Sequence, residues 1–193
     1  GGTEADALAV QGAVDALNGR CTLIVSAIEH EAIAKSAGHS GAVVQTAYVT
    51  ADGTLDLDDL RTRMTKWDVD ALGAPVLCIM LANNETGIIQ PVAEAAAIMR
   101  DAGGLTICDA VQALGKIPVN VALLGVDYLS VSAHKVGGPQ GVGALWHRAG
   151  APLKAILHGG GQERSLRSGT ENVAGIAGFG AAVEAAIRDL PNY

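Results

Sequence analysis

Runs of consecutive apolar residues alternate along the chain with segments whose apolar positions have helical spacing. Uninterrupted apolar runs are typical of strands buried on both faces of a parallel sheet. Such runs cover 22–27, 74–82, 105–109 and 128–131, and weaker strand patterns cover 41–50 and 143–146. Helical spacing covers 7–17, a segment that ends near 37, 56–66, 91–102 and 172–190. This alternation predicts an α/β fold with a mainly parallel sheet and helices on both faces.

Residues that favour helix ends support several of these boundaries. Thr3 is expected to cap the first helix, with Asp6 three residues later as its capping-box partner. Asp56 is suited to cap the helix that follows it, and Pro91 to open the next one. The pair Gly103–Gly104 is typical of a helix end.

Composition indicates a single domain with a large aliphatic core. The chain has 193 residues, of which 49% are hydrophobic and 17% are charged. Aromatic residues make up only 3%, so we expect the core to consist of Ala, Val, Leu and Ile. A chain of this length suits one domain, or one large domain of something bigger.

Charge and cysteine usage exclude several classes of protein. The net charge of −7 argues against a general nucleic-acid or anionic-membrane binder. No apolar run reaches the roughly 18 residues of a membrane-spanning helix. Cys21, Cys78 and Cys108 are widely spaced and lie in or beside apolar runs, which fits reduced, buried thiols better than disulfides or a metal site. We therefore expect a cytoplasmic protein without a structural metal.

Polar side chains follow successive apolar runs at the points where the expected strands end. These side chains are His30, Asn84, Asp109, Ser132 and Lys135. In open α/β sheets, ligands bind at the carboxyl ends of the strands. Each residue alone has an ordinary explanation, such as a helix cap, a turn former or a solvated lysine. Their shared position at one edge of the sheet instead predicts a ligand site.

The segment 130–135 ends an apolar strand in two hydroxyls, an imidazole and a lysine, and Gly and Pro follow at once. We expect Lys135 to be partly desolvated where it leaves the buried strand. Desolvation frees a lysine amine to act as a nucleophile toward a carbonyl group.

The segment Ser132-Ala133-His134-Lys135 resembles the Schiff-base segment of class V pyridoxal-phosphate enzymes, and of NifS/IscS-like cysteine desulfurases in particular. Other strings resemble the same family in the same order along the chain. They are Gly1–Thr3, Glu29–His30, Asn83–Gly87, Asp109–Gln112 and Gly159–Thr170. The resemblance implies the large domain of a pyridoxal 5'-phosphate (PLP)-dependent transferase of fold type I.

The resemblance assigns a set of residues to the ring of this cofactor. It makes Lys135 the lysine that forms the Schiff base, and His30 the imidazole that stacks on the pyridine ring and takes part in proton transfers. Asp109 would be the partner of the pyridine nitrogen, which makes the ring a stronger electron sink. Asn84 and Gln112 would contact the phenolic oxygen. Lys135 and His30 are the expected catalytic residues.

The resemblance also assigns a site for the cofactor phosphate. Gly2 and Thr3 would bind it through the start of the first helix, together with Ser132 and His134. Thr170 would reach the phosphate site of a partner subunit, which implies a homodimer.

The activity implied by the resemblance is that of a cysteine desulfurase. L-cysteine would give alanine, and its sulfur would pass to an enzyme cysteine and on to an acceptor protein for iron–sulfur cluster or thio-cofactor assembly. None of the three cysteines matches the motif of that sulfur-accepting residue. We therefore expect residues 1–193 to be the cofactor-binding large domain, with the family's N-terminal segment and C-terminal small domain absent from this chain.

Two alternatives stay open. A selenocysteine lyase or a class V aminotransferase would share the cofactor residues. A non-catalytic dimerisation scaffold would keep the fold but form no Schiff base at Lys135.

Overall fold

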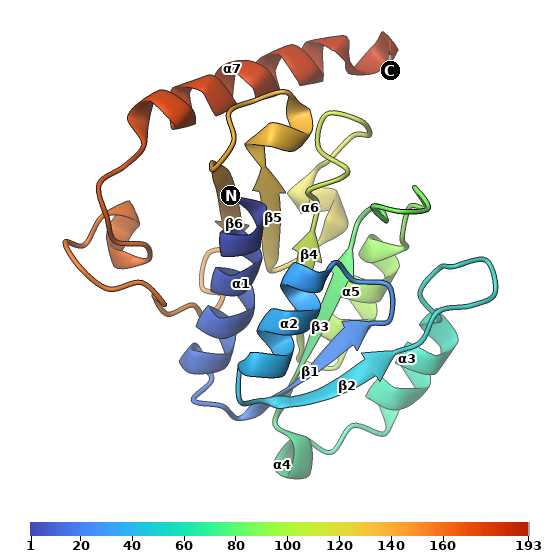
Figure 1. Cartoon of the computed structure of the whole chain (residues 1–193). Helices are drawn as coiled ribbons and strands as arrows, with labels where there is room; N and C mark the ends of the chain where they lie inside the picture. Colours follow the sequence, from blue (N-terminus) through green and yellow to red (C-terminus); the bar gives the residue numbers. More distant parts are fainter. Residues whose placement is uncertain (193) are drawn as a thin grey trace.

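A six-stranded sheet runs through the protein in the computed structural model, which describes residues 1–192 (Figure 1). Tyr193, the last residue of the expected domain, lies outside the described residues. The strand order is β2-β1-β3-β4-β5-β6, and only β6 is antiparallel to its neighbour. The strands are β1 (Cys21–Ser26), β2 (Val43–Ala47), β3 (Ala74–Met80), β4 (Leu105–Asp109), β5 (Tyr128–Ser132) and β6 (Gly143–His147). The expected mainly parallel sheet is confirmed.

Helices cover both faces of this sheet, as the sequence predicts. One face carries α1 (Gly2–Ala16) and α2 (Glu31–His39), and the other carries α3 (Leu57–Thr65) and α5 (Val92–Asp101). The long helix α7 (Val173–Asp189) crosses the carboxyl edge of the sheet and contacts the 3₁₀ turn Ala133–Val136 (Figure 1). The remaining elements are α4 (Val69–Leu72), α6 (Val121–Leu124) and the 3₁₀ turns Glu163–Ser165 and Leu190–Asn192.

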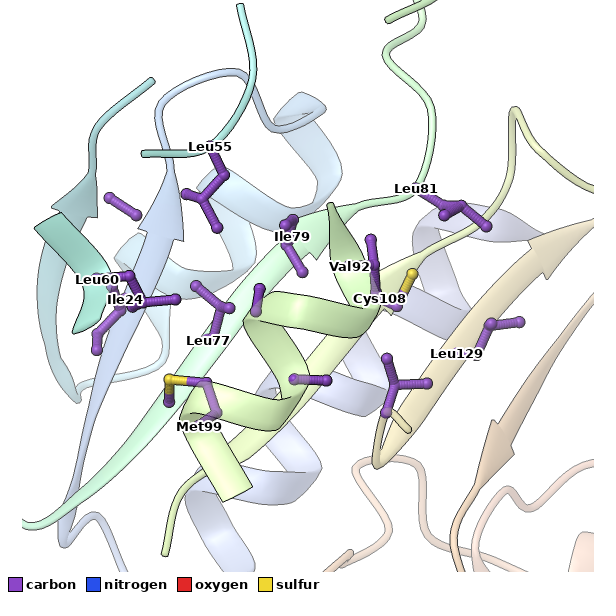
Figure 2. Packing of buried hydrophobic residues seen from close by; sticks show 14 of the residues in the cluster. Ile24, Leu55, Leu60, Leu77, Ile79, Leu81, Val92, Met99, Cys108 and Leu129 are labelled. Carbon is purple, nitrogen blue, oxygen red and sulfur yellow. The ribbon is translucent and has the colours of Figure 1, made fainter. Parts of the chain in front are cut away.

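An apolar core forms on each face of the sheet, because successive residues of a strand point to opposite faces. A smaller third cluster joins Phe179 of α7 to Ala133 and Val142. Figure 2 shows the core under α3 and α5, where Leu77 and Ile79 of β3 meet Met99 of α5. The opposite core contains Val76 and Ile107, packed under α1 and α2. Most side chains of both cores are aliphatic or sulfur-containing, as the low aromatic content predicts, and the exceptions are the buried Tyr128 and the partly buried Trp67.

The carboxyl ends of β1, β3, β4 and β5 lie at one edge of the sheet, since these strands are parallel. Asp109, at the end of β4, pairs with Met80 of β3 on one side and with Ser130 of β5 on the other. Paired residues in a parallel sheet share a face. The side chains of Asp109 and Ser130 therefore lie on the face that α1 covers.

The expected capping box at the first helix is wrong. The helix α1 begins at Gly2 with Gly1 as its N-cap, and no side chain caps it. Asp6 is only 2% exposed and accepts a hydrogen bond from the Ser130 hydroxyl across the core. Asp6 lies on the buried face of α1, so its carboxyl points to the sheet and not back to Thr3.

Other boundaries agree with their sequence signals. Asp56 caps α3 through the backbone N–H groups of Asp58 and Asp59, as expected. Pro91 directly precedes α5, and Asn172 caps α7. The four-residue helices α4 and α6 were not expected, because each is too short to show a helical period.

Among the described residues, no helix combines the length and the apolarity that a bilayer crossing needs.

Candidate functional site

Asp109 is the most buried ionisable residue among those that the sequence places at the carboxyl edge of the sheet. It is 6% exposed, and its Oδ1 accepts the backbone N–H of Val111 at 2.8 Å. Burial raises the pKa of Asp109, while the Val111 N–H and the charge of His30 lower it in part. His30, which follows β1, is therefore near enough to act on Asp109, as a shared ligand site requires.

His30 is oriented by the start of α2. Its Nδ1 accepts the backbone N–H of Ala32 at 3.1 Å, so this imidazole is the N-cap of the helix. A ring nitrogen that accepts a hydrogen bond carries no proton, so the neutral ring is protonated at Nε2. The exposed ring thus presents a fixed N–H donor at the carboxyl edge of the sheet.

The start of α1 and the end of β5 form one cradle. Gly2 is buried, and a Cβ added there would lie 3.1 Å from Val111 Cγ2 and 3.3 Å from Ser132 Cβ. The Ser132 Oγ and His134 Nδ1 are 2.9 Å apart. The first N–H groups of a helix have no partner within the helix and attract anions. The cradle therefore consists of the first backbone N–H groups of α1, the Ser132 hydroxyl and the His134 imidazole. A side chain at position 2 would fill the space between them, and Thr3 is exposed beside it.

The expected desolvation of Lys135 is wrong for the described chain. Lys135 is exposed in the 3₁₀ turn Ala133–Val136, of which only Ala133 is buried. The turn carries the chain away from the buried end of β5, so the lysine side chain reaches solvent. Burial and the charge of Lys135 lower the pKa of Lys116, so the two amines lie near each other.

Lys116 holds Gln112 in place. Its Nζ donates to the Gln112 backbone oxygen at 3.0 Å and to the side-chain Oε1 at 3.2 Å. Because the amide oxygen is engaged, the side-chain NH₂ of Gln112 is left to donate to another acceptor.

Two of the expected site residues make no described polar contact with the others. Asn84 and Thr170 are both exposed, and within residues 1–192 neither hydrogen-bonds to another expected site residue. The buried Asn83 is the one that anchors its turn: its Nδ2 donates to the Ile28 oxygen at 3.1 Å, and its Oδ1 accepts the Thr86 N–H at 2.8 Å.

The loop that contains Thr170 is tied to α1 by an ion pair. The Arg167 Nε lies 2.6 Å from the Glu4 Oε1. This contact places Arg167 of the 158–172 segment beside the start of α1 within the same chain.

Sequence reasoning missed four polar residues near the site: Asp6, Glu29, Lys116 and Ser130. A signal existed for Asp6, because it precedes Ala9, Val10 and Ala13 by three, four and seven residues and so shares their apolar stripe. A charged residue on such a stripe is buried with the rest of the face.

The three cysteines are buried, as expected. Burial raises the pKa of Cys21, and it raises the pKa of Cys78 and Cys108 well above the ordinary value. Thiols in such surroundings stay protonated and unreactive.

A family model described as aminotransferase class-V matches residues 1–189. The chain belongs to this family. A cysteine desulfurase from Cereibacter sphaeroides is 41% identical over 97% of this class-V chain and 48% of its own length. A cysteine desulfurase IscS from Dictyoglomus turgidum is 42% identical over 98% of this chain and 48% of its own length.

A solved NifS-like protein has the same fold as this class-V chain. It superposes with a TM-score of 0.90 at 38% identity, and the match covers 99% of this chain and 52% of that protein. The chain spans about half the length of the curated relatives that it matches. These comparisons confirm the resemblance to class V enzymes and the fold type.

Proposed function

We propose that this chain binds pyridoxal 5'-phosphate at the carboxyl edge of its sheet, as the cofactor-binding part of a cysteine desulfurase. The observation that carries the proposal is the convergence of the Gly2 cradle, the Ser132–His134 pair and the buried Asp109 at one edge. The likeness to curated cysteine desulfurases supports the choice of reaction.

The cradle suits the cofactor phosphate. The N–H groups of Gly2 and Thr3 and the hydroxyl of Ser132 supply donors, and His134 adds a further nitrogen beside Ser132. A side chain at Gly2 would crowd Ser132, so glycine leaves the phosphate room to approach the helix end.

Asp109 and His30 suit the cofactor ring. Asp109 would accept the ring N–H in a charge-assisted hydrogen bond, which keeps the ring nitrogen protonated. His30 would stack on the ring, with its Nε2 left free to take part in proton transfer. The bound cofactor supplies an electron sink for the bond that breaks at the substrate.

Lys135 would supply the amine that holds the cofactor carbonyl and later moves a proton at the substrate. Gln112, held by Lys116, would donate its NH₂ to the phenolic oxygen of the cofactor. Asn84 would be the second donor to that oxygen.

The substrate we propose is L-cysteine, which gives alanine and a sulfur atom. Cys21, Cys78 and Cys108 are poor sulfur acceptors because they are buried and unreactive. The persulfide would therefore form on a cysteine outside this chain and pass to an acceptor protein for iron–sulfur cluster or thio-cofactor assembly. The unpaired buried thiols favour a reducing compartment, and we infer the cytoplasm.

A homodimer is part of the proposal, with Thr170 reaching the phosphate site of the partner. Exposed apolar side chains on α7 support a protein contact there. Val173 is 72% exposed, Ile176 is 45% exposed and Ile187 is 57% exposed.

The test is a visible absorption spectrum of the purified chain with pyridoxal 5'-phosphate, before and after borohydride. We expect a cofactor band that borohydride fixes covalently, that Lys135→Ala abolishes, and that the exposed control Lys66→Ala retains. Alanine formed from L-cysteine by that sample, with an added small thiol as the sulfur acceptor, would identify the reaction, whereas release from selenocysteine alone or transfer to a 2-oxo acid would favour the class V alternatives. A folded chain with no band would favour the non-catalytic scaffold.

A further inference from the structure

Three carboxyl side chains from three separate elements lie at the carboxyl edge of the sheet. Asp6 comes from α1, Glu29 from the turn between β1 and α2, and Asp109 from the end of β4. The register of the sheet accounts for their shared position. In the strand register, Asp109 lies beside Met80 of β3 and beside Ser130 of β5. Met80 is hydrogen-bonded to Glu29, and Ser130 is hydrogen-bonded to Asp6.

The contacts themselves are specific. The Ser130 hydroxyl donates to Asp6 Oδ1, and the Met80 backbone N–H donates to Glu29 Oε1 at 2.6 Å. Glu29 is half-buried as a residue, but its Oε2 is shielded from solvent and has no hydrogen-bond partner in the described chain. One buried carboxyl oxygen beside Asp109 is therefore unsatisfied.

No Lys or Arg side chain forms an ion pair with this group within residues 1–192. None of the described ion pairs includes Asp6, Glu29 or Asp109. In the same part of the chain, no set of three His, Cys, Asp or Glu side chains is arranged to hold a metal ion. Burying several unpaired carboxylates is costly, so protons are the cations available to the group.

The titratable groups that face the three carboxyls are few. His30 lies before α2, and Cys78 of β3 lies on the same face of the sheet as Asp109, whereas Cys108 of β4 points to the opposite core. Burial, with the charge of Asp109, raises the pKa of Asp6 to about 7, and burial raises the pKa of Glu29 well above its ordinary value. Both thiols stay neutral near pH 7, so the carboxyls dominate the local charge.

We propose that Asp6, Glu29 and Asp109 share protons as one unit, and that Asp6 and Glu29 are positioning residues that set the charge of Asp109. A ring nitrogen that arrives unprotonated takes one of the shared protons through Asp109, and none is released. One that arrives protonated displaces this proton to solvent. In both cases Asp109 ends as a carboxylate. That the ring is the one of pyridoxal 5'-phosphate rests on the proposed function, whereas proton sharing in the cofactor-free chain does not.

The first test follows the infrared band of protonated carboxyl groups in the cofactor-free chain from about pH 5 to about pH 9. We expect the wild-type band to disappear near neutral pH. Asp6→Asn and Glu29→Gln should each remove part of the protonated-carboxyl band. The rest of the band should disappear at a lower pH than in wild type, because the remaining carboxyls no longer face the negative charge of the replaced one. The exposed controls Asp101→Asn and Glu94→Gln should change nothing.

A variant that shifts the titration in the opposite direction separates proton sharing from a merely structural role. The Ser130 hydroxyl lowers the pKa of Asp6, so Ser130→Ala should shift the band loss upward by about 1 to 2 pH units. A wild-type chain that already lacks a protonated carboxyl band at about pH 6, or variants that titrate like wild type, would overturn the proposal.

The second test counts the protons exchanged when pyridoxal 5'-phosphate binds, from calorimetric heats in buffers of different ionisation enthalpy. We expect Asp6→Asn to change this number and Asp101→Asn to leave it unchanged. Equal numbers in wild type and Asp6→Asn would refute the proposal while the cofactor site stands. Failure of wild type to bind would refute the proposed function, and the infrared titration alone would then decide on proton sharing.

Discussion

Replacing Asp6 with asparagine should stabilise the cofactor-free chain, and increasingly so as the pH rises. Asp6 is 2% exposed, and its pKa is raised from 3.8 to about 7, first by burial and then by the charge of Asp109. A raised carboxyl pKa means that the folded state favours the protonated form. This contribution to stability is complete below about pH 3.8 and is lost as the pH rises through about 7. Asparagine cannot ionise, so the variant avoids the loss.

The magnitude follows from the size of the shift. The rise from 3.8 to about 7 spans about 3 pH units, and each unit corresponds to 1.36 kcal/mol. The variant should therefore gain up to about 4 kcal/mol over wild type above pH 7. Asparagine keeps the side-chain oxygen that accepts the Ser130 hydroxyl, so little contact energy is lost.

The assay is urea unfolding of the cofactor-free chain at a series of pH values, for wild type, Asp6→Asn and the exposed control Asp101→Asn. We expect the free energy of unfolding of Asp6→Asn to rise relative to wild type between about pH 4 and about pH 8 and then to level off. The control should follow wild type throughout. A difference between Asp6→Asn and wild type that is constant across this range would refute the reasoning.

Three further predictions concern the site and the fold that supports it. Ser132→Ala should weaken binding of pyridoxal 5'-phosphate about tenfold or more, since a hydrogen bond to a charged group is lost, and should leave the affinity for phosphate-free pyridoxal unchanged in a fluorescence titration. Lys116→Met should lower pyridoxal 5'-phosphate affinity in the same titration by releasing the glutamine that it holds, whereas the exposed Lys66→Met should not; equal affinities in both would contradict this role. Gly73→Ala should destabilise the chain by more than about 2 kcal/mol in urea, because φ is +69° and the new Cβ would lie 2.5 Å from the Arg20 backbone. Gly19→Ala has a similar φ of +72° but no atom within 4 Å, so a loss as large as that of Gly73→Ala would count against the steric argument.

The architecture of the sheet was predictable because its signals are local. The run 105–109 is a buried strand with the boundaries expected from the sequence, and its final aspartate lies at the carboxyl edge. Parallel strands with buried faces read as uninterrupted apolar runs, so both the strand type and the edge of the site follow.

Details that depend on distant contacts were not predictable. Asp6 contacts Ser130 across 124 residues of sequence, and no local pattern distinguishes that contact from a capping box with Thr3. The exposure of Lys135 depends on how one 3₁₀ turn leaves β5, which a run of Gly and Pro does not specify. Lys116 was missed because its partner Gln112 is one helical turn away in a segment without a helical period.

The most direct test of the account is the location of the lysine that holds the cofactor. The chain would be loaded with pyridoxal 5'-phosphate, reduced with borohydride, digested and mapped by mass spectrometry. The account predicts a single pyridoxyl label on Lys135, at one per chain. A label on the neighbouring Lys116, or labels spread over exposed lysines such as Lys35 and Lys66, would contradict it.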